Sequence, residues 1–328
     1  MPRVETGSRL HFGLLAPCVR TGRRFGGAGL MIEQPGLLVT LEPWERDVIE
    51  GPLTNRAADV LREIRTRLHG PGPLPFGVCL RVEHAAPIHV GLGTGTQLAL
   101  AVAWAYVALL QRVHRIAARG TDSAAELARL TNRGARSGIG LHGFLHGGFL
   151  LDGGKIGDDQ TGSAPSLIAR FDFPNDWRIV LAIPRGDQGL HGDRERDAFA
   201  HLEPVSEDLL ARQCRRLLLG ILPAIAEQDY PAFAEALHEY NRDAGLPFKR
   251  VQRGFYTGGV LADRIAVVQS LGIPATGQTS WGPTVFAIVP DADKAAWLSQ
   301  RLPAELAFAD CQILVTQARN RGACLNRV

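Results

Sequence analysis

The spacing of apolar positions along the chain predicts helices in several segments. Apolar residues recur every three to four positions in the first of them, and Gly70 follows it as a stop signal. The second is apolar almost throughout, which predicts a buried helix too short to span a bilayer. Ser123 and Glu126 form a capping-box pattern ahead of a further short helix that ends by Gly134. The longer segments are residues 54–69, 98–110, 206–228, 256–271 and 291–301.

Short apolar runs between these helices predict strands. They cover residues 37–41, 76–82, 149–151, 179–183, 285–289 and 312–315, and residues 70–75 form a Gly/Pro loop. Strands and helices are interspersed without a regular βαβ rhythm, which favours an α+β fold over a doubly wound sheet. The polar segment 153–166 is the best candidate for a domain boundary, so we expect domains over residues 1–160 and 161–328.

The composition narrows the class of protein. With 328 residues, 45% hydrophobic and 21% charged, the chain can form two folded domains with their own cores. A net charge of +3, without basic runs interleaved with aromatics, argues against nucleic-acid binding. The N-terminus has no signal-peptide character. The five cysteines are scattered and form no C-x-x-C pair, which indicates reduced thiols in the cytoplasm rather than a zinc or iron–sulfur site.

Residues 87–97 form a glycine- and threonine-rich loop that runs into the apolar helix. Its three glycines, Gly91, Gly93 and Gly95, permit a tight turn and leave backbone N–H groups unshielded. The helix that follows adds its own N–H groups and the positive end of its dipole, so an anion such as a phosphate fits there. A plain glycine turn before a core helix is the alternative.

Three segments resemble the motifs of the GHMP superfamily, which includes galactokinase, homoserine kinase and mevalonate kinase. Residues 87–97 resemble its phosphate loop, and residues 137–139 with the following glycines resemble its middle motif. Residues 277–283 lie where its C-terminal glycine motif falls. The resemblance implies a two-domain fold, with an N-terminal ribosomal-S5-like domain that holds the phosphate loop and a C-terminal ferredoxin-like domain.

Four further segments are similar to the β-ribofuranosylaminobenzene 5′-phosphate synthase family. They are residues 8–14, 24–29, 136–140 and 189–195. The resemblance implies that phosphoribosyl pyrophosphate is condensed with 4-aminobenzoate or 4-hydroxybenzoate. Carbon dioxide and pyrophosphate are released, in the pathway to tetrahydromethanopterin.

Two alternatives stay open, an ATP-dependent small-molecule kinase and a ligand-binding member without catalysis. Many GHMP kinases have an Asp base after Ser-Gly-Ile, whereas this chain has Gly140 there. The phosphate loop departs too, because Thr94-Gly95-Thr96-Gln97 replaces Ser-Ser-Ala. Both departures favour the synthase.

The proposed chemistry needs groups for phosphates, a carboxylate and an arene. We expect the phosphates to be bound by residues 91–97, that is Gly91, Leu92, Gly93, Thr94, Gly95, Thr96 and Gln97, together with Gly26, Gly27 and Ser137. Arg24 offers a planar fork for phosphate or carboxylate, with a surface cation as the alternative. Arg9 and His11, two apart, share one face if they lie on a strand.

The remaining candidates lie later in the chain. Asp193 and Glu195 could place carboxylates near Mg²⁺ or the sugar hydroxyls, or be a solvated cluster. Thr279, Ser280 and Trp281 supply two hydroxyls and a flat face that could stack on the arene, or pack in the core.

His142 could handle a proton. His142 and His146 have a metal-binding spacing only on a helix, which the neighbouring glycines make unfavourable. We therefore name no metal ligand.

The resemblance also sets the expected cofactors and partners. Mg²⁺ would enter with phosphoribosyl pyrophosphate, and no ATP is expected. The partners are the two small-molecule substrates, with no nucleic acid and no membrane. We expect a cytoplasmic homodimer. Which benzoate is used does not follow from the residues.

Overall fold

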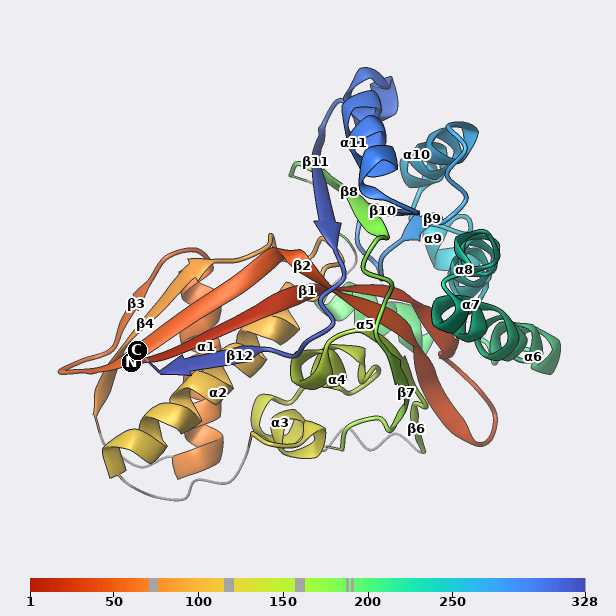
Figure 1. Ribbon diagram of the computed structural model, residues 1–328. Coiled ribbons are helices and arrows are strands. Elements are labelled where there is room, and N and C mark those ends of the chain that lie inside the picture. Colours follow the sequence, from red (N-terminus) through yellow and green to blue (C-terminus); the bar gives the residue numbers. More distant parts are fainter. Residues whose placement is uncertain (71–75, 115–120, 157–162, 187–188, 190–191, 328) are drawn as a thin grey trace.

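The computed structural model describes residues 1–70, 76–114, 121–156, 163–186, 189 and 192–327 (Figure 1). The predicted loop at 70–75 therefore lies, apart from Gly70, outside the described residues, as do Leu190 and His191 of the 189–195 motif.

Within the described residues the larger sheet has eight strands, built around a long hairpin (Figure 1). β1 (Pro2–Ala16) and β2 (Arg23–Trp44) pair antiparallel along most of their length. The other strands are β3 (Val48–Glu50), β4 (Gly77–His84), β5 (Phe149–Asp152), β6 (Lys155–Ile156), β7 (Leu167–Phe171) and β12 (Cys324–Arg327). β12 pairs with β1, which places the two ends of the chain side by side.

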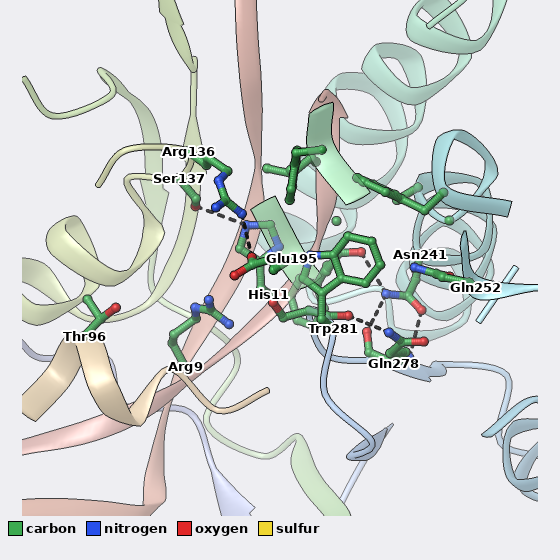
Figure 2. Close-up of a pocket in the computed structure, with 18 of the residues that line it drawn as sticks. Arg9, His11, Thr96, Arg136, Ser137, Glu195, Asn241, Gln252, Gln278 and Trp281 are labelled. Atoms are coloured by element: carbon green, nitrogen blue, oxygen red, sulfur yellow. Dashed lines mark hydrogen bonds and ion pairs between the residues drawn. The ribbon is translucent and has the colours of Figure 1, made fainter. Parts of the chain in front are cut away.

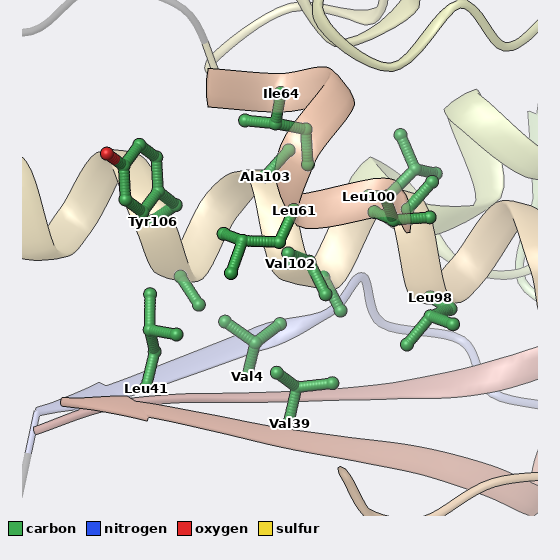
Figure 3. Packing of buried hydrophobic residues seen from close by; sticks show 14 of the residues in the cluster. Val4, Val39, Leu41, Leu61, Ile64, Leu98, Leu100, Val102, Ala103 and Tyr106 are labelled. Atoms are coloured by element: carbon green, nitrogen blue, oxygen red, sulfur yellow. The ribbon is translucent and has the colours of Figure 1, made fainter. Parts of the chain in front are cut away.

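Among the described residues, four helices pack on this sheet, and all four contribute buried side chains to its core. They are α1 (Thr54–His69), α2 (Thr94–His114), α3 (Ala124–Thr131) and α4 (Ile139–His146). Figure 3 shows Leu61 and Ile64 of α1 beside α2, above Val4 of β1 and Val39 of β2. α2 is longer than predicted, and its Thr94–Val113 stretch could cross a membrane by length and composition, but 72% of that stretch is buried inside the protein.

The second half of the chain forms a four-stranded antiparallel sheet within the described residues, in the order β11-β8-β10-β9. These strands are β8 (Arg178–Pro184), β9 (Thr276–Gln278), β10 (Val285–Val289) and β11 (Cys311–Gln317). α10 (Gly259–Ser270) and α11 (Ala292–Arg301) pack on it through Leu261, Ile265 and Leu298.

Further helices lie beside the long hairpin (Figure 1). They are α5 (Gly192–Ala200), α6 (Glu207–Arg216), α7 (Leu222–Glu227), α8 (Tyr230–Ala244) and α9 (Lys249–Gln252), with a π-helical turn at Leu217–Ile221. A second core joins the two sheets here. Phe12 of β1 packs against Phe149 of β5 and Phe286 of β10.

The α+β prediction is confirmed, with helices packed on sheets that are antiparallel apart from the parallel pair β3–β4. The capping box is confirmed as well, since Ser123 accepts a hydrogen bond from the backbone N–H of Glu126 at 3.2 Å. The division at residue 160 stays a prediction. β7 and β12 both follow that residue and yet pair with strands of the larger sheet.

Besides α2, several elements differ from the predictions. The helix predicted over residues 206–228 is divided into α6, the π-helical turn and α7. A single strand was expected over residues 37–41, but β1 and β2 occupy most of the first 44 residues. The predicted helix at 256–271 begins only at Gly259. Helix α8 was not predicted at all, although Asp229 caps it and Pro231 stands in its first turn.

Candidate functional site

A cavity of about 290 Å³ lies where β1, the start of α2, and helices α5 and α8 meet the loop after β9. The predicted residues that line it are Arg9, His11, Thr96, Ser137, Glu195, Ser280 and Trp281. In Figure 2, Arg9 and Thr96 lie on one side, and Asn241, Gln252 and Gln278 lie on the other. The cavity therefore has a cationic end beside the glycine loop and an uncharged polar end beside α8 and α9.

Arg9 is the cation at the first end. Its backbone N–H donates to the Leu92 carbonyl at 3.0 Å, and its Nη1 donates to the Gly91 carbonyl at 3.2 Å. Burial lowers the pKa of Arg9 to about 10, so the guanidinium remains charged at neutral pH. A Cβ on Gly93 would lie 2.7 Å from Arg9 Cγ, so glycine at that position lets the arginine lie against the loop.

The glycine loop has the tight turn that was predicted. Gly91 and Gly93 have φ of 90° and 74°, a region that favours glycine. Gly95 is in the first turn of α2, where an added Cβ would meet nothing within 4 Å. The hydroxyl of Thr94 donates to the Pro87 carbonyl at 2.9 Å, so its hydrogen is used inside the loop.

Of the predicted loop residues 91–97, Thr96 alone lines the cavity of the described chain, and Leu92 and Gln97 are buried in the interior. Leu92 belongs to the core between the two sheets. Gln97 accepts from the Thr6 hydroxyl at 2.9 Å and donates to the Gly140 carbonyl at 3.0 Å. It thereby ties α2 to β1 and α4.

The loop after β9 closes over both the glycine loop and β1. The Thr279 hydroxyl donates to the Gly91 carbonyl at 2.9 Å and accepts from the His11 N–H at 3.0 Å. Ser280 has a φ of 55°, unusual for a residue with a Cβ, and its N–H donates to the His11 carbonyl at 3.0 Å. The motif at 277–283 therefore fixes the position of two cavity segments.

Trp281 lines the cavity and is also packed on aromatic neighbours. Its ring lies 4.6 Å from the Phe248 ring and 6.0 Å from the Phe199 ring, between centroids. Arg136 lies over Phe199 at 4.2 Å and pairs with Glu195 at 2.6 Å. All five residues line the cavity, so a flat aromatic ligand would meet both the aromatic rings and the Arg136–Glu195 ion pair.

A chain of hydrogen bonds runs from the cavity into the protein. His11 Nε2 lies 3.1 Å from Ser137 Oγ, and Ser137 Oγ donates to Asp152 Oδ2 at 3.1 Å. Asp152 is fully buried at the end of β5 and also accepts from the N–H groups of Gly138 at 2.8 Å and Gly154 at 3.0 Å. Burial raises the pKa of Asp152 to about 6, although these donors oppose the shift.

Asp193 does not join Glu195 in the cavity. Both are on α5, and side chains two residues apart point about 200° apart around a helix. Asp193 is exposed and pairs with Arg196. The expected carboxylate pair is thus separated, and Asp193 is the solvated charge of the alternative interpretation.

Arg24, Gly26 and Gly27 also lie outside the cavity lining of the described chain. Arg24 is on β2 opposite Lys155. Gly27 lets β2 approach β1, because a Cβ there would be 2.2 Å from the Gly13 carbonyl oxygen. Gly26 sits close to the Asp152 carbonyl. These glycines shape the hairpin.

The expectation that glycines prevent a helix around His142 and His146 is wrong, because α4 covers both. A Cβ on Gly143 would lie 2.5 Å from Met31 Sδ, so glycine is needed for α4 to pack on β2. His142 is buried and its Nε2 lies 2.7 Å from the Pro165 carbonyl, outside the cavity lining of the described chain. Burial lowers the pKa of His142, which keeps it neutral. Among the described residues, no group of three His, Cys, Asp or Glu could hold a metal.

The sequence analysis missed Asp152 and the polar end of the cavity. Asp152 ends an apolar strand just before two glycines, a position that gave a local signal. Asn241 bridges the Phe12 carbonyl at 2.8 Å and the Gln278 carbonyl at 2.9 Å. Its recognition required α8, which was not predicted.

Comparison with known proteins places the chain in a class and then in a family. The family model of the GHMP kinases N terminal domain matches residues 53–148. The solved homoserine kinase from Cytophaga hutchinsonii superposes with a TM-score of 0.67 at 14% identity, covering 99% of this chain and 96% of that one. The protein thus has the GHMP kinase fold.

Closer relatives define the family. The β-ribofuranosylphenol 5′-phosphate synthase of Methanothermobacter thermautotrophicus is 34% identical over 98% of this chain and 97% of its own. The enzyme of that name from Archaeoglobus fulgidus is 33% identical over 98% of both chains. The chain belongs to the β-ribofuranosylphenol 5′-phosphate synthase family, which supports the synthase over the kinase alternative.

Proposed function

We propose that the protein transfers a phosphoribosyl group from phosphoribosyl pyrophosphate to 4-hydroxybenzoate or 4-aminobenzoate with loss of carbon dioxide. The observation that carries the proposal is the cavity itself. It joins a half-buried arginine, which lies against the glycine loop, to an aromatic wall, so one site offers complementary surfaces to an anionic sugar and an arene. The product would serve tetrahydromethanopterin biosynthesis.

The reaction forms one bond and breaks two. The bond between the anomeric carbon and the pyrophosphate oxygen breaks, and pyrophosphate leaves with the electron pair. The ring carbon that bears the carboxylate attacks the anomeric carbon. The bond to the carboxylate then breaks, its electrons restore the aromatic ring, and carbon dioxide leaves. No covalent enzyme intermediate is needed, so positioning and charge stabilisation contribute most of the rate.

The residues divide this work between the two ends of the cavity. The glycine loop and Arg9 receive the phosphates, because backbone N–H groups, a helix N-terminus and a guanidinium all favour anions. Trp281 and Phe248 hold the arene through their ring faces. Arg136, held by Glu195, provides a second cation for a carboxylate or phosphate.

Mg²⁺ is the expected companion of the pyrophosphate. Among the described residues that line the cavity, Glu195 has the carboxylate and Asn132 an amide oxygen, and both are oxygen ligands that Mg²⁺ accepts. The ion would neutralise the leaving group. We further propose that no ATP is used, and that the enzyme is a cytoplasmic homodimer.

The test is a product assay. Purified protein is incubated with phosphoribosyl pyrophosphate, Mg²⁺ and each benzoate, and the release of carbon dioxide and of pyrophosphate is measured. The two products are expected in equal amounts. A parallel reaction with ATP and homoserine or mevalonate tests the kinase alternative. ATP-dependent phosphorylation without release of carbon dioxide would refute the proposal.

A further inference from the structure

The hydrogen bonds around Ser137 determine how protons are arranged on His11. A serine hydroxyl has one hydrogen to donate and two lone pairs to accept with. Its hydrogen goes to Asp152 Oδ2 at 3.1 Å, and one lone pair accepts from the Ile139 N–H at 3.2 Å. One lone pair is left for His11 Nε2 at 3.1 Å, so that nitrogen must carry the hydrogen.

From this count we propose that Asp152 is a positioning residue, which acts through Ser137 to hold His11 with its hydrogen on Nε2 and its lone pair on Nδ1. His11 lines the cavity, whereas Asp152 lies behind Ser137 and is fully buried. An imidazole in this tautomer accepts a hydrogen bond at Nδ1, so the ligand it suits is a hydroxyl donor of the sugar or the phenol. This part rests on the proposed function.

Protonation of Asp152 would reverse the chain. A carboxylic acid can donate to Ser137, which then can donate its own hydrogen to His11 Nε2, and the ring hydrogen moves to Nδ1. The arrangement therefore depends on an ionised Asp152. Its pKa of about 6, raised by burial, places the change just below neutral pH.

Three ionisable groups beside this hydrogen-bond network have pKa values well away from 6. Arg9 on β1 has a pKa of about 10, and burial raises the pKa of Tyr240 on α8 well above its ordinary value. Burial, with Arg9, lowers the pKa of His11 to about 3, so the ring itself stays neutral. The Arg136–Glu195 pair faces the cavity from the other side. Arg23 and Lys155 are the neighbouring cations on β2 and β6.

The experiment uses Ser137→Ala, which removes the link but leaves both backbone donors to Asp152. Ser137→Thr restores the hydroxyl, and Ser206→Ala is the matched control, since Ser206 accepts one N–H bond at the start of α6, remote from the cavity. The first readout is the tautomer of His11, from ¹⁵N chemical shifts of the histidine-labelled protein. The second is the pH profile of kcat/KM for the benzoate.

Wild type and Ser206→Ala are expected to hold His11 hydrogen on Nε2 at pH 7.5 and to lose activity below about pH 6. Ser137→Ala is expected to give a mixture of His11 tautomers, a kcat about tenfold lower, and a pH profile of kcat/KM without the loss of activity near pH 6. Ser137→Thr is expected to restore the single tautomer, the kcat and the pH profile of the wild type. Unchanged His11 shifts in Ser137→Ala would overturn the proposal. The ¹⁵N chemical shifts are measured without turnover. Failure of the product assay would therefore refute the proposed reaction, whereas the ¹⁵N shifts would still test the tautomer of His11.

Discussion

Gly95→Ala is the most direct test of the phosphate cradle. Gly95 is in the first turn of α2, and an added Cβ would meet no atom within 4 Å, so the folded protein accommodates the methyl group without strain. Alanine also loses less backbone entropy than glycine on folding, and the change should stabilise the protein by about 0.5–1 kcal/mol. The fold is therefore unharmed while the approach to the loop is narrowed.

The expected loss of activity follows from the hydrogen bonds at stake. If a phosphate lies on the N–H groups of the first turn, a methyl group there displaces at least one charge-assisted bond. Such bonds contribute about 1.5–3 kcal/mol, or roughly 10- to 150-fold in kcat/KM for phosphoribosyl pyrophosphate. Gly93→Val would not test the loop alone, because a side chain at Gly93 would strain the backbone at its φ of 74° and would also press on Arg9.

Gly259→Ala supplies the matched control. Gly259 is the first residue of α10, and a Cβ there also meets nothing within 4 Å. Both variants are assayed by steady-state kinetics and by urea unfolding. We expect equal or higher stability for both, with lost activity for Gly95→Ala alone. Wild-type kcat/KM in a stable Gly95→Ala protein would show that the phosphates do not approach this turn.

Two further predictions concern charged groups. Arg9→Lys should lower kcat/KM roughly tenfold to a hundredfold, because a lysine lacks the guanidinium that Arg9 places on the glycine loop. Arg24→Lys should remain near wild type, because Arg24 lies outside the cavity lining of the described chain. The reverse ranking of the two variants in steady-state kinetics would contradict the assignment. Burial raises the pKa of Asp152 from 3.8 to about 6. The contribution of this group to the free energy of unfolding is therefore complete below pH 3.8 and is lost as the pH rises through 6. The difference in unfolding free energy between wild type and Asp152→Asn should change by up to roughly 3 kcal/mol between pH 4 and pH 7 in urea titrations, and a constant difference would refute the shift.

The elements that the sequence identified correctly are those in which a regular pattern of apolar residues is bounded by residues that end a helix or strand. Helix α1 was predicted over its observed range because apolar spacing and Gly70 agree. β10 matches its prediction at both ends, since a continuous apolar run is bounded by polar or turn residues. The same logic applies to α11, whose N-cap Asp291 accepts from the Lys294 N–H at 2.7 Å.

Where local rules failed, a tertiary contact decided the outcome. The glycines of α4 argue against a helix in isolation, yet Gly143 is the residue that allows α4 to lie on Met31. Asp152 could not be associated with His11 from sequence, because they are 141 positions apart and meet only through the β1–β2–β5 register. That Arg9 and His11 face the same side could be predicted from the sequence, because residues two apart on a strand lie on one face.

The position of Gly140 links fold to chemistry. In kinases with the resembling motif, this is where the catalytic Asp is expected. Here a Cβ at Gly140 would lie 3.0 Å from Thr96 Cγ2, and the Gly140 carbonyl accepts from Gln97, so α4 packs closely on the first turn of α2. A side chain at this position would have to displace the Thr96 side chain in the first turn of α2. The carboxylate next to this motif is instead Asp152, which reaches the cavity through Ser137 and His11 and is buried too deeply to accept a proton from a substrate hydroxyl directly. The close packing at Gly140 therefore disfavours a carboxylate at this position, and the proposed transfer, in which the protein abstracts no proton, does not need one there.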